Sequence, residues 1–314
     1  MVSIYIKFTK ENQLKVNKIL LIAGNGFIGG HIVEWLHKKY EIHILSRRKI
    51  FKCDYFNKYK NEVKFIELKS LNELPDISIS DYYCIVNLLT IIKPSKGNEL
   101  FIDEISDELH FNNLLLSKMD DSVKYIYCSS AGTLYEPNGN KQIETSPLVP
   151  ANEYGLLKSL NEQIIKYFHK NSIILRISNP IGYGQNNIDK KGLVTQMALN
   201  LINKNEMVLY APDQIIKDYF DIDDLCILID KMLNNFKPDV YNVCYGKSYS
   251  ITFIKNLLEG LTNNHLNYKV KDINSYDNQL VIISNDKIKN EYSVEFNSLE
   301  NTCIKLLNQL YERM

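Results

Sequence analysis

The sequence has no excess of charge of either sign, because Lys and Arg together number 37 and Asp and Glu also number 37. A chain without net charge has no general electrostatic attraction for nucleic acid or for an anionic membrane surface. No stretch of uninterrupted apolar residues reaches the roughly 20 that a membrane-spanning helix needs. We therefore expect no nucleic acid and no membrane among the partners of this protein.

Cysteine and histidine patterns typical of metal sites are also missing. The 6 cysteines are scattered and never spaced as CxxC, and the 6 histidines include no HExxH pair. Asp221, Asp223 and Asp224 precede an apolar helical stretch, where helix capping and the helix dipole explain them without a metal. We expect no metal site. Cys84 stands inside an apolar run, which indicates a buried thiol and a reducing, cytoplasmic location.

Apolar strand-like runs alternate with helical stretches through the first half of the chain. Strands are predicted at 18–23, 41–46, 63–67, 83–88, 123–128 and 172–177, with helices at 28–36, 99–119 and 153–169. This alternation is typical of a parallel sheet covered on both faces, so the sequence predicts a doubly wound α/β fold.

The regular alternation of strands and helices ends after residue 178. Shorter elements, predicted at 193–203, 207–210, 223–234 and 299–311, indicate a smaller C-terminal α/β lobe. We therefore expect a nucleotide-binding domain at 1–178 and a substrate-binding lobe at 179–314, with the chain crossing between the two. Residues 1–16 carry charges that exclude a signal peptide, and we interpret them as an N-terminal extension.

A glycine-rich turn links the first predicted strand to the first helix. Its residues, Gly24-Asn25-Gly26-Phe27-Ile28-Gly29, form a GxGxxG pattern. Glycines let a backbone approach a pyrophosphate, and the N-terminus of the following helix offers free N–H groups. The context predicts a dinucleotide site with Gly24, Gly26, Phe27, Ile28 and Gly29 in contact with the cofactor, against the alternative of a turn that needs glycine for packing.

The end of the second predicted strand indicates which dinucleotide binds. NAD-binding folds place an acid there, but this chain has Ser46, Arg47 and Arg48. Guanidinium groups suit a 2′-phosphate, so the sequence favours NADP(H), with NAD(H) possible and a solvated basic loop as the alternative. Leu88, at the end of the fourth predicted strand, is a further candidate for cofactor contact.

Tyr154 and Lys158 lie at the start of the helix predicted at 153–169. Their i, i+4 spacing places both side chains on one helix face. A nearby ammonium group lowers the pKa of a phenol, so we expect Tyr154 to act as a general acid/base. The strand before this helix ends in hydroxyl residues, including Ser130 and Thr133.

These segments occur in an order that resembles the NAD-dependent epimerase/dehydratase family, the extended short-chain dehydrogenases. The resemblance covers about residues 18–251 and includes the glycine-rich turn, Ser-Ser-Ala-Gly-Thr-Leu-Tyr at 129–135, the Tyr154/Lys158 pair, Asn179-Pro-Ile-Gly, and Lys217-Asp-Tyr. It implies a Rossmann domain with a small lobe, and hydride transfer at C4 of a nucleoside-diphosphate sugar. It also implies a homodimer formed by the helices predicted at 99–119 and 153–169.

The resemblance assigns a role to each matched residue. Tyr154 is expected to be the acid/base, and Lys158 to hold the nicotinamide ribose. Asn179 is expected beside the diphosphate of the substrate, with Lys217 and Tyr276 as further substrate-binding candidates.

Four positions depart from the family pattern. The usual hydroxyl partner of the tyrosine is Ala131 here, so we expect Thr133, with Ser130 second, to polarise the sugar carbonyl. Ala23 replaces the first glycine of the family, which is tolerable if its backbone angles are ordinary. Lys217 stands in place of an arginine, and the region around Tyr276 lacks the second arginine expected at the diphosphate.

Three functional hypotheses follow. The first is an NADPH-dependent reductase of nucleotide-linked 4-keto-6-deoxysugars for surface polysaccharide. The second is a 4-epimerase with tightly bound NAD, and the third is a dinucleotide-binding protein without catalysis. A dehydratase is disfavoured because Gly132 and Thr133 stand where that chemistry uses an Asp-Glu pair.

Overall fold

The computed structural model describes residues 17–92, 102–185, 192–272 and 280–313. Its centre is a parallel sheet of 7 strands in the order β11-β7-β5-β4-β1-β2-β3. The strands are β1 (Lys18–Ile22), β2 (Glu41–Ser46), β3 (Val63–Glu67), β4 (Cys84–Asn87), β5 (Lys124–Ser130), β7 (Ser172–Ile177) and β11 (Val240–Val243). The predicted doubly wound α/β fold is confirmed.

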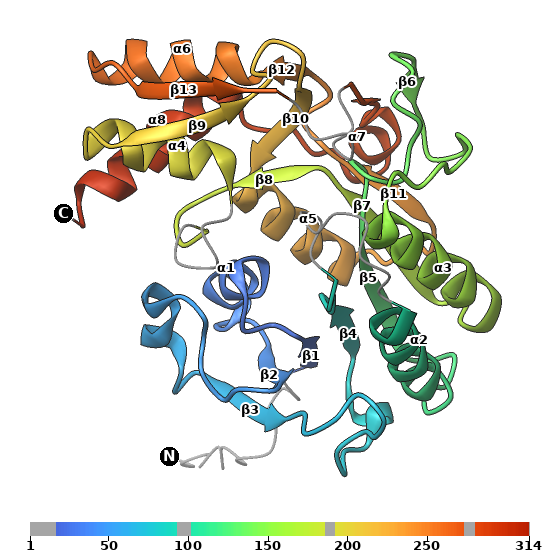
Figure 1. The fold of residues 1–314 in the computed structure, drawn as a ribbon. Helices are drawn as coiled ribbons and strands as arrows, with labels where there is room; N and C mark the ends of the chain where they lie inside the picture. Colours follow the sequence, from blue (N-terminus) through green and yellow to red (C-terminus); the bar gives the residue numbers. More distant parts are fainter. Residues whose placement is uncertain (1–16, 93–101, 186–191, 273–279, 314) are drawn as a thin grey trace, which may run out of the picture.

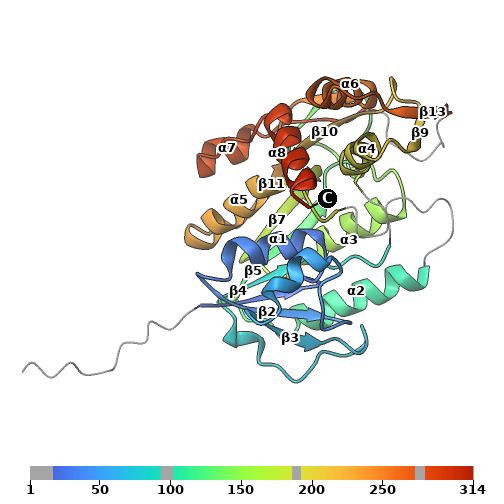
Figure 2. The same ribbon diagram turned by 90° about the vertical axis from the view of Figure 1, so that its left-hand side faces the viewer.

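Helices cover both faces of this sheet (Figures 1 and 2). On one face, α1 (Phe27–Leu36) and α5 (Ile222–Asn234) share a buried apolar cluster with the strands, together with α7 (Asp286–Tyr292). On the other face, α2 (Ile102–Leu116) and α3 (Glu153–Phe168) bury their apolar residues. Because both faces are covered, the central strands are mostly apolar, and every residue of β7 is buried.

A smaller lobe stands over the carboxyl ends of the central strands (Figure 1). It contains α4 (Leu193–Ile202), α6 (Ile251–Thr262) and α8 (Leu299–Tyr311) around a separate apolar core. Its strands are β8 (Asn179–Ile181), β10 (Ile216–Asp221) and β12 (Ser248–Ser250) in one sheet, and β9 (Glu206–Tyr210) with β13 (Asn267–Lys271) in another. The short elements β6 (Lys141–Gln142), β14 (Ile282–Ile283), η1 (Asp54–Tyr59) and η2 (Ile79–Asp81) complete the described part of the chain.

The chain crosses between the two parts after residue 178. It builds β8 and the lobe, then returns with α5 and with β11, which pairs with β7 at the edge of the central sheet. The Asp221 side chain caps α5 by accepting a hydrogen bond from the Asp223 N–H at 3.0 Å, as expected for an aspartate that begins a helix.

Membrane-spanning helices, metal sites and cysteines were considered in the sequence and can be compared with the described ranges. No helix there is long and apolar enough to cross a membrane. Within the same ranges, no group of three or more His, Cys, Asp or Glu side chains is arranged to hold a metal ion. All six cysteines are buried, and none of them forms a disulfide bond. The N-terminal extension at 1–16 and Tyr276 lie outside the described residues.

Candidate functional site

A cavity of about 490 Å³ lies at the carboxyl ends of the central parallel strands. Each of the strands β1, β2, β4, β5 and β7 contributes to its lining either its last residue or the residue that directly follows it. This edge is where open parallel sheets bind their ligands. The cavity brings together most of the residues predicted from the sequence: Gly26, Phe27, Ile28, Gly29, Arg47, Leu88, Ser130, Thr133, Tyr154, Lys158, Asn179 and Lys217. Gly24, Ser46 and Arg48 are not among its lining residues.

The glycine-rich turn has the shape of a dinucleotide cradle. Gly26 lines the cavity, and a Cβ added there would find no atom nearer than the Ala23 carbonyl oxygen at 4.0 Å, so it would occupy open space. A Cβ at Gly29 would lie 2.1 Å from the Gly24 carbonyl oxygen, so Gly29 lets α1 pack directly on the turn. Gly26 caps α1 without a side chain, which leaves the first N–H groups of the helix for an anion. These residues fit a dinucleotide.

Ala23 corrects one expectation. Its φ is 55°, in the left-handed region, rather than the ordinary backbone angles that would make an alanine easy to accept there. The Ala23 N–H donates to the Leu45 carbonyl oxygen at 2.8 Å, at the point where the chain leaves β1 and turns toward α1. The position therefore has the backbone conformation that favours glycine.

Two cations, Arg47 and Lys52, line the cavity beside β2, and no Asp or Glu does so among the described residues. The Ser46 hydroxyl donates to the Arg48 carbonyl oxygen at 2.7 Å, so it stabilises the loop that follows β2. Asn25 ties the same loop to the glycine-rich turn, since its Nδ2 donates to the Ile50 carbonyl oxygen at 3.1 Å. Lys52 was missed by the sequence reasoning, although it closes the basic run that begins at Arg47.

The Tyr154 phenol faces the hydroxyl residues at the end of β5. Asn152 fixes the start of α3, because its side chain accepts a hydrogen bond from the Gly155 N–H at 2.9 Å. Ser130 and Tyr154 both line the cavity, and Ser130 acts to lower the pKa of the phenol. The Thr133 hydroxyl in turn donates to Ser130 Oγ at 3.1 Å. Ser130 and Thr133 are thus bonded to each other in the cavity that Tyr154 also lines.

Lys158 is buried one turn further along α3. Its Nζ donates to the Leu89 carbonyl oxygen at 2.9 Å and lies 5.8 Å from the centre of the Tyr154 ring. Burial lowers the pKa of the Lys158 ammonium. Burial also raises the pKa of Tyr154, and Ser130 opposes this rise. The expectation that the ammonium lowers this phenol's pKa therefore needs correction, because desolvation is the largest influence on the pKa of Tyr154 and raises it.

Ala131 points away from these hydroxyl groups. It is fully buried in a small apolar cluster with Tyr135, Cys244, Val281 and Ile283, and it does not line the cavity. The residues on either side of it, Ser130 and Gly132, do line the cavity. With no hydroxyl at position 131, Ser130 and Thr133 are the hydroxyl residues next to it in the sequence that line the cavity.

A second cavity of about 340 Å³ adjoins the first on the side of the smaller lobe. Asn179, Lys217 and Gln185 line both cavities, so they stand where the two meet. The Asn179 Nδ2 donates to the Asp218 carbonyl oxygen at 2.8 Å, which holds β8 beside β10. The predicted substrate residues Asn179 and Lys217 thus lie between the cofactor cavity and the lobe.

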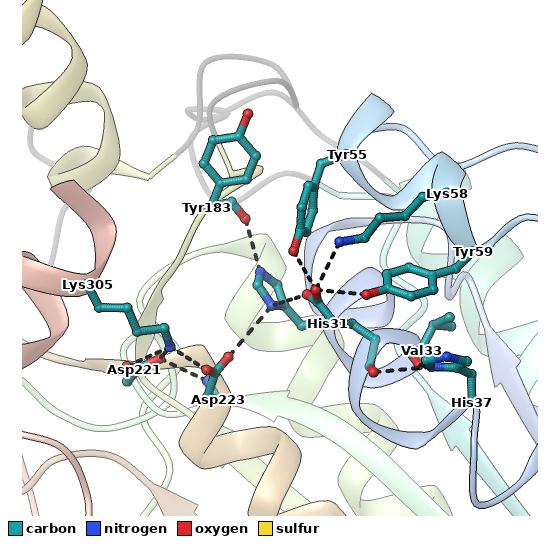
Figure 3. A network of polar contacts seen from close by, with 11 residues as sticks. His31, Val33, His37, Tyr55, Lys58, Tyr59, Tyr183, Asp221, Asp223 and Lys305 are labelled. Carbon is teal, nitrogen blue, oxygen red and sulfur yellow. Dashed lines mark hydrogen bonds and ion pairs between the residues drawn. The ribbon is translucent and has the colours of Figure 1, made fainter. Parts of the chain in front are cut away.

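A polar network behind α1 connects the sheet with the smaller lobe (Figure 3). His31 of α1 contacts the Tyr183 carbonyl oxygen through Nε2 at 3.0 Å, and its Nδ1 lies 3.7 Å from Glu34 and 3.8 Å from Asp223. Lys305 of α8 pairs with Asp221 at 2.7 Å and also with Asp223. Burial lowers the pKa of His31, so its neutral ring joins α1 to the start of α5 and to the chain after β8.

The sequence of this chain matches the model of the NAD dependent epimerase/dehydratase family over residues 19–244. This chain belongs to that family. The match contains the glycine-rich turn, the Tyr154/Lys158 pair and the junction residues Asn179 and Lys217, so the family assignment and the cavity concern the same residues.

Relatives within the family differ in the reaction that they catalyse. The chain is 26% identical over 261 residues to the dTDP-4-dehydro-6-deoxyglucose reductase of Escherichia coli, covering 77% of this chain and 80% of the reductase. It is 26% identical over 325 residues to the UDP-glucose 4-epimerase of Bacillus subtilis, covering 91% and 94%. The UDP-glucose 4-epimerase of Thermotoga maritima, solved with UDP-glucose, has the same fold, with a TM-score of 0.82 at 19% identity over 94% and 99% of the chains.

Proposed function

We propose that this protein is a nucleotide-sugar oxidoreductase acting at C4, and specifically an NADPH-dependent reductase of a nucleotide-linked 4-keto-6-deoxysugar. Its product would serve surface polysaccharide synthesis. The observation that carries the proposal is that Tyr154, Ser130 and Thr133 line one cavity, which continues into the smaller lobe. A protonated phenol is the form that gives a proton to a carbonyl oxygen.

The residues of the site can perform this reduction in a defined arrangement. The nicotinamide, when bound, supplies the hydride that reduces C4. Tyr154 donates its proton to the C4 oxygen, and the hydroxyl groups of Ser130 and Thr133 orient that oxygen by hydrogen bonds. Lys158, held at the Leu89 carbonyl, lies beneath the phenol and is placed to bind the nicotinamide ribose. Asn179 and Lys217 stand at the junction of the cavities, where we assign the diphosphate.

The lining of the cavity beside β2 supports NADP(H). Arg47 and Lys52 place two positive charges there, and among described lining residues no carboxylate is present to hold a ribose 2′-hydroxyl. Arginine pairs with phosphate in a bidentate fashion, so a 2′-phosphate would gain two charge-assisted contacts that NAD(H) lacks.

The test begins with the dinucleotide. One sample of purified protein is denatured, and any dinucleotide that it releases is identified. NADPH and NADH are titrated into a second, folded sample from which bound dinucleotide has been removed. We expect an empty site with tighter binding of NADPH, and NADPH oxidation when dTDP- or UDP-linked 4-keto-6-deoxysugars are added. Tyr154→Phe should lower kcat by about 10²–10⁴-fold while NADPH binding is retained. Unchanged turnover in Tyr154→Phe would exclude Tyr154 as the proton donor.

A 4-epimerase is the second candidate. It is favoured by similarity to the Bacillus subtilis enzyme, which extends over 91% of this chain. An epimerase removes hydride from C4 and returns it, so its cofactor stays bound. Stoichiometric NAD(H) released on denaturation, together with interconversion of UDP-sugars that differ at C4, would replace the reductase with this function.

A further inference from the structure

A buried carboxylate stands behind the Tyr154/Lys158 pair. Glu108 of α2 is fully buried, and its Oε1 lies 4.0 Å from Lys158 Nζ. Its Oε2 accepts a hydrogen bond from the Ile91 N–H at 2.9 Å, and its Oε1 accepts one from Asn161 Nδ2 at 3.2 Å. Burial of a carboxylate is costly unless it is paired and hydrogen-bonded, and Glu108 meets both conditions.

The same carboxylate holds the chain segment that follows β4. This segment lines the cofactor cavity with Leu88, Thr90 and Ile91. Lys158 donates to the Leu89 carbonyl oxygen at 2.9 Å, while Glu108 accepts from the Ile91 N–H. The segment is therefore bound at neighbouring peptide groups by the two members of one buried ion pair.

From this arrangement we propose that Glu108 is a positioning residue that serves as the counter-ion of Lys158, keeping it charged and seated between the phenol of Tyr154 and the segment after β4. The proposal rests on the proposed function, because it concerns the same Tyr154/Lys158 pair. Glu108 acts through Lys158 and does not line the cavity itself.

The charges around Lys158 make Glu108 its main electrostatic support. Burial lowers the pKa of Lys158, and among the groups that raise it, Glu108 has the largest effect. Burial raises the pKa of Glu108, and Lys158 is the group that most opposes this. The other titratable or charged groups that face Lys158 and Glu108 come from two elements. They are Tyr125, Tyr127 and Cys128 of β5, and Tyr154 and Glu162 of α3. Glu162 is bound to Arg176 at 2.7 Å, so its charge is already compensated.

Glu108→Gln removes the charge and retains one oxygen for the Ile91 N–H. Asn112→Ala is the matched control, because Asn112 is buried on the same helix and its Nδ2 donates to Asn161 Oδ1 at 2.7 Å. Both variants disturb contacts of Asn161, but only Glu108→Gln removes a charge beside Lys158. A Glu108→Asp variant keeps the charge and withdraws it by one methylene group.

The experiment is a pH titration of the lysine side chains by NMR, through 13Cε and 15Nζ shifts of labelled protein, with Lys158→Met identifying the Lys158 signal. We expect the pKa of Lys158 to fall by about one unit or more in Glu108→Gln, by less in Glu108→Asp, and not at all in Asn112→Ala. If Glu108→Gln does not fold, the Glu108→Asp titration decides by the same sign. An unchanged Lys158 pKa in the variant that folds, or an equal fall in Asn112→Ala, would overturn the proposal.

The titration needs no substrate, so it separates this proposal from the proposed function. A protein that turns over no nucleotide sugar but shows the expected change at Lys158 would retain the Glu108 assignment and lose the reductase. In an active protein, a Lys158 that loses its proton more readily should move the alkaline limb of the kcat profile to lower pH in Glu108→Gln. Asn112→Ala should leave that limb in place.

Discussion

At the residue scale, the two hydroxyl groups predicted to polarise the sugar carbonyl are bonded to each other. The Thr133 hydroxyl donates to Ser130 Oγ at 3.1 Å, and Ser130 is the residue that opposes the rise in the pKa of Tyr154. Ser130 is the last residue of β5, while Thr133 lies in the following turn. We therefore expect Ser130 to affect the phenol more directly than Thr133.

Ser130→Ala tests this order. The Ser130 hydroxyl opposes the rise in the pKa of the phenol, and its loss should lower kcat about tenfold. Thr133→Val is the control, because it leaves the Ser130 hydroxyl in place and should lower kcat less. Initial rates of NADPH oxidation measure both, and a loss confined to Thr133→Val would make Thr133 the main hydroxyl.

Ala23 gives a second prediction at this scale. An alanine with φ of 55° bears a backbone cost of about 1 kcal/mol, whereas glycine adopts the angle freely. After the larger unfolded-state entropy of glycine is subtracted, Ala23→Gly should raise the free energy of unfolding by about 0.5 kcal/mol. Ala198→Gly in the middle of α4, where alanine is the better residue, should instead lower it by about 1 kcal/mol or more. Urea unfolding measures both, and a loss of stability in Ala23→Gly would contradict the argument.

At the element scale, one buried carboxylate joins the three segments that meet beside the substrate junction. Asp218 of β10 accepts hydrogen bonds from the Ser178 hydroxyl at 2.7 Å, from the Tyr245 N–H at 2.9 Å and from the Gly246 N–H at 2.7 Å. Burial raises the pKa of Asp218 from 3.8 to about 6, even though these hydrogen bonds oppose the rise.

The raised pKa predicts a pH dependence of stability. Between pH 3.8 and about 6 the folded state binds more protons at Asp218 than the unfolded state, so this group's contribution is largest below that window and is lost as pH rises through it. The expected loss is on the order of 3 kcal/mol. Urea unfolding from pH 4 to pH 7 should show a smaller decline in Asp218→Asn than in the original protein. An identical slope in both would show that Asp218 titrates normally.

At the scale of the whole molecule, the two parts are joined by long-range polar contacts as well as by the returning chain. His31, Asp223 and Lys305 belong to α1, α5 and α8, and Figure 3 shows them in one network. The network lies behind the glycine-rich turn, so it ties the cofactor side of the cavity to the lobe that forms the second cavity.

The exposed face of α3 supports a prediction about assembly. Leu156 and Leu160 lie one helical turn apart and are 43% and 37% exposed. We expect this face, with α2, to pair with a second copy of the chain as the family resemblance implies. Light scattering after gel filtration should give a dimer, and Leu156→Glu with Leu160→Glu should give a folded monomer. Leu156 and Leu160 are the exposed leucines in the described residues of α2 and α3, so these helices offer no second leucine pair as a control. Lys166→Glu on α3 serves instead, and this variant should remain dimeric. A monomer in the unaltered protein would refute the prediction.

Local patterns in the sequence determined the features whose physics is local. The glycine-rich turn, the i, i+4 spacing of Tyr154 and Lys158 and the apolar strands depend on neighbours along the chain, so the parallel α/β fold and a large part of the cavity's lining could be predicted. Tertiary structure alone decided what depends on contacts between distant segments. Glu108 meets Lys158, Lys52 joins Arg47 at the cavity, Ala131 turns into an apolar cluster and Ala23 takes a left-handed angle because packing places them so. The raised pKa of Tyr154 belongs to the second group, since desolvation is a property of the folded interior and not of the sequence around the residue.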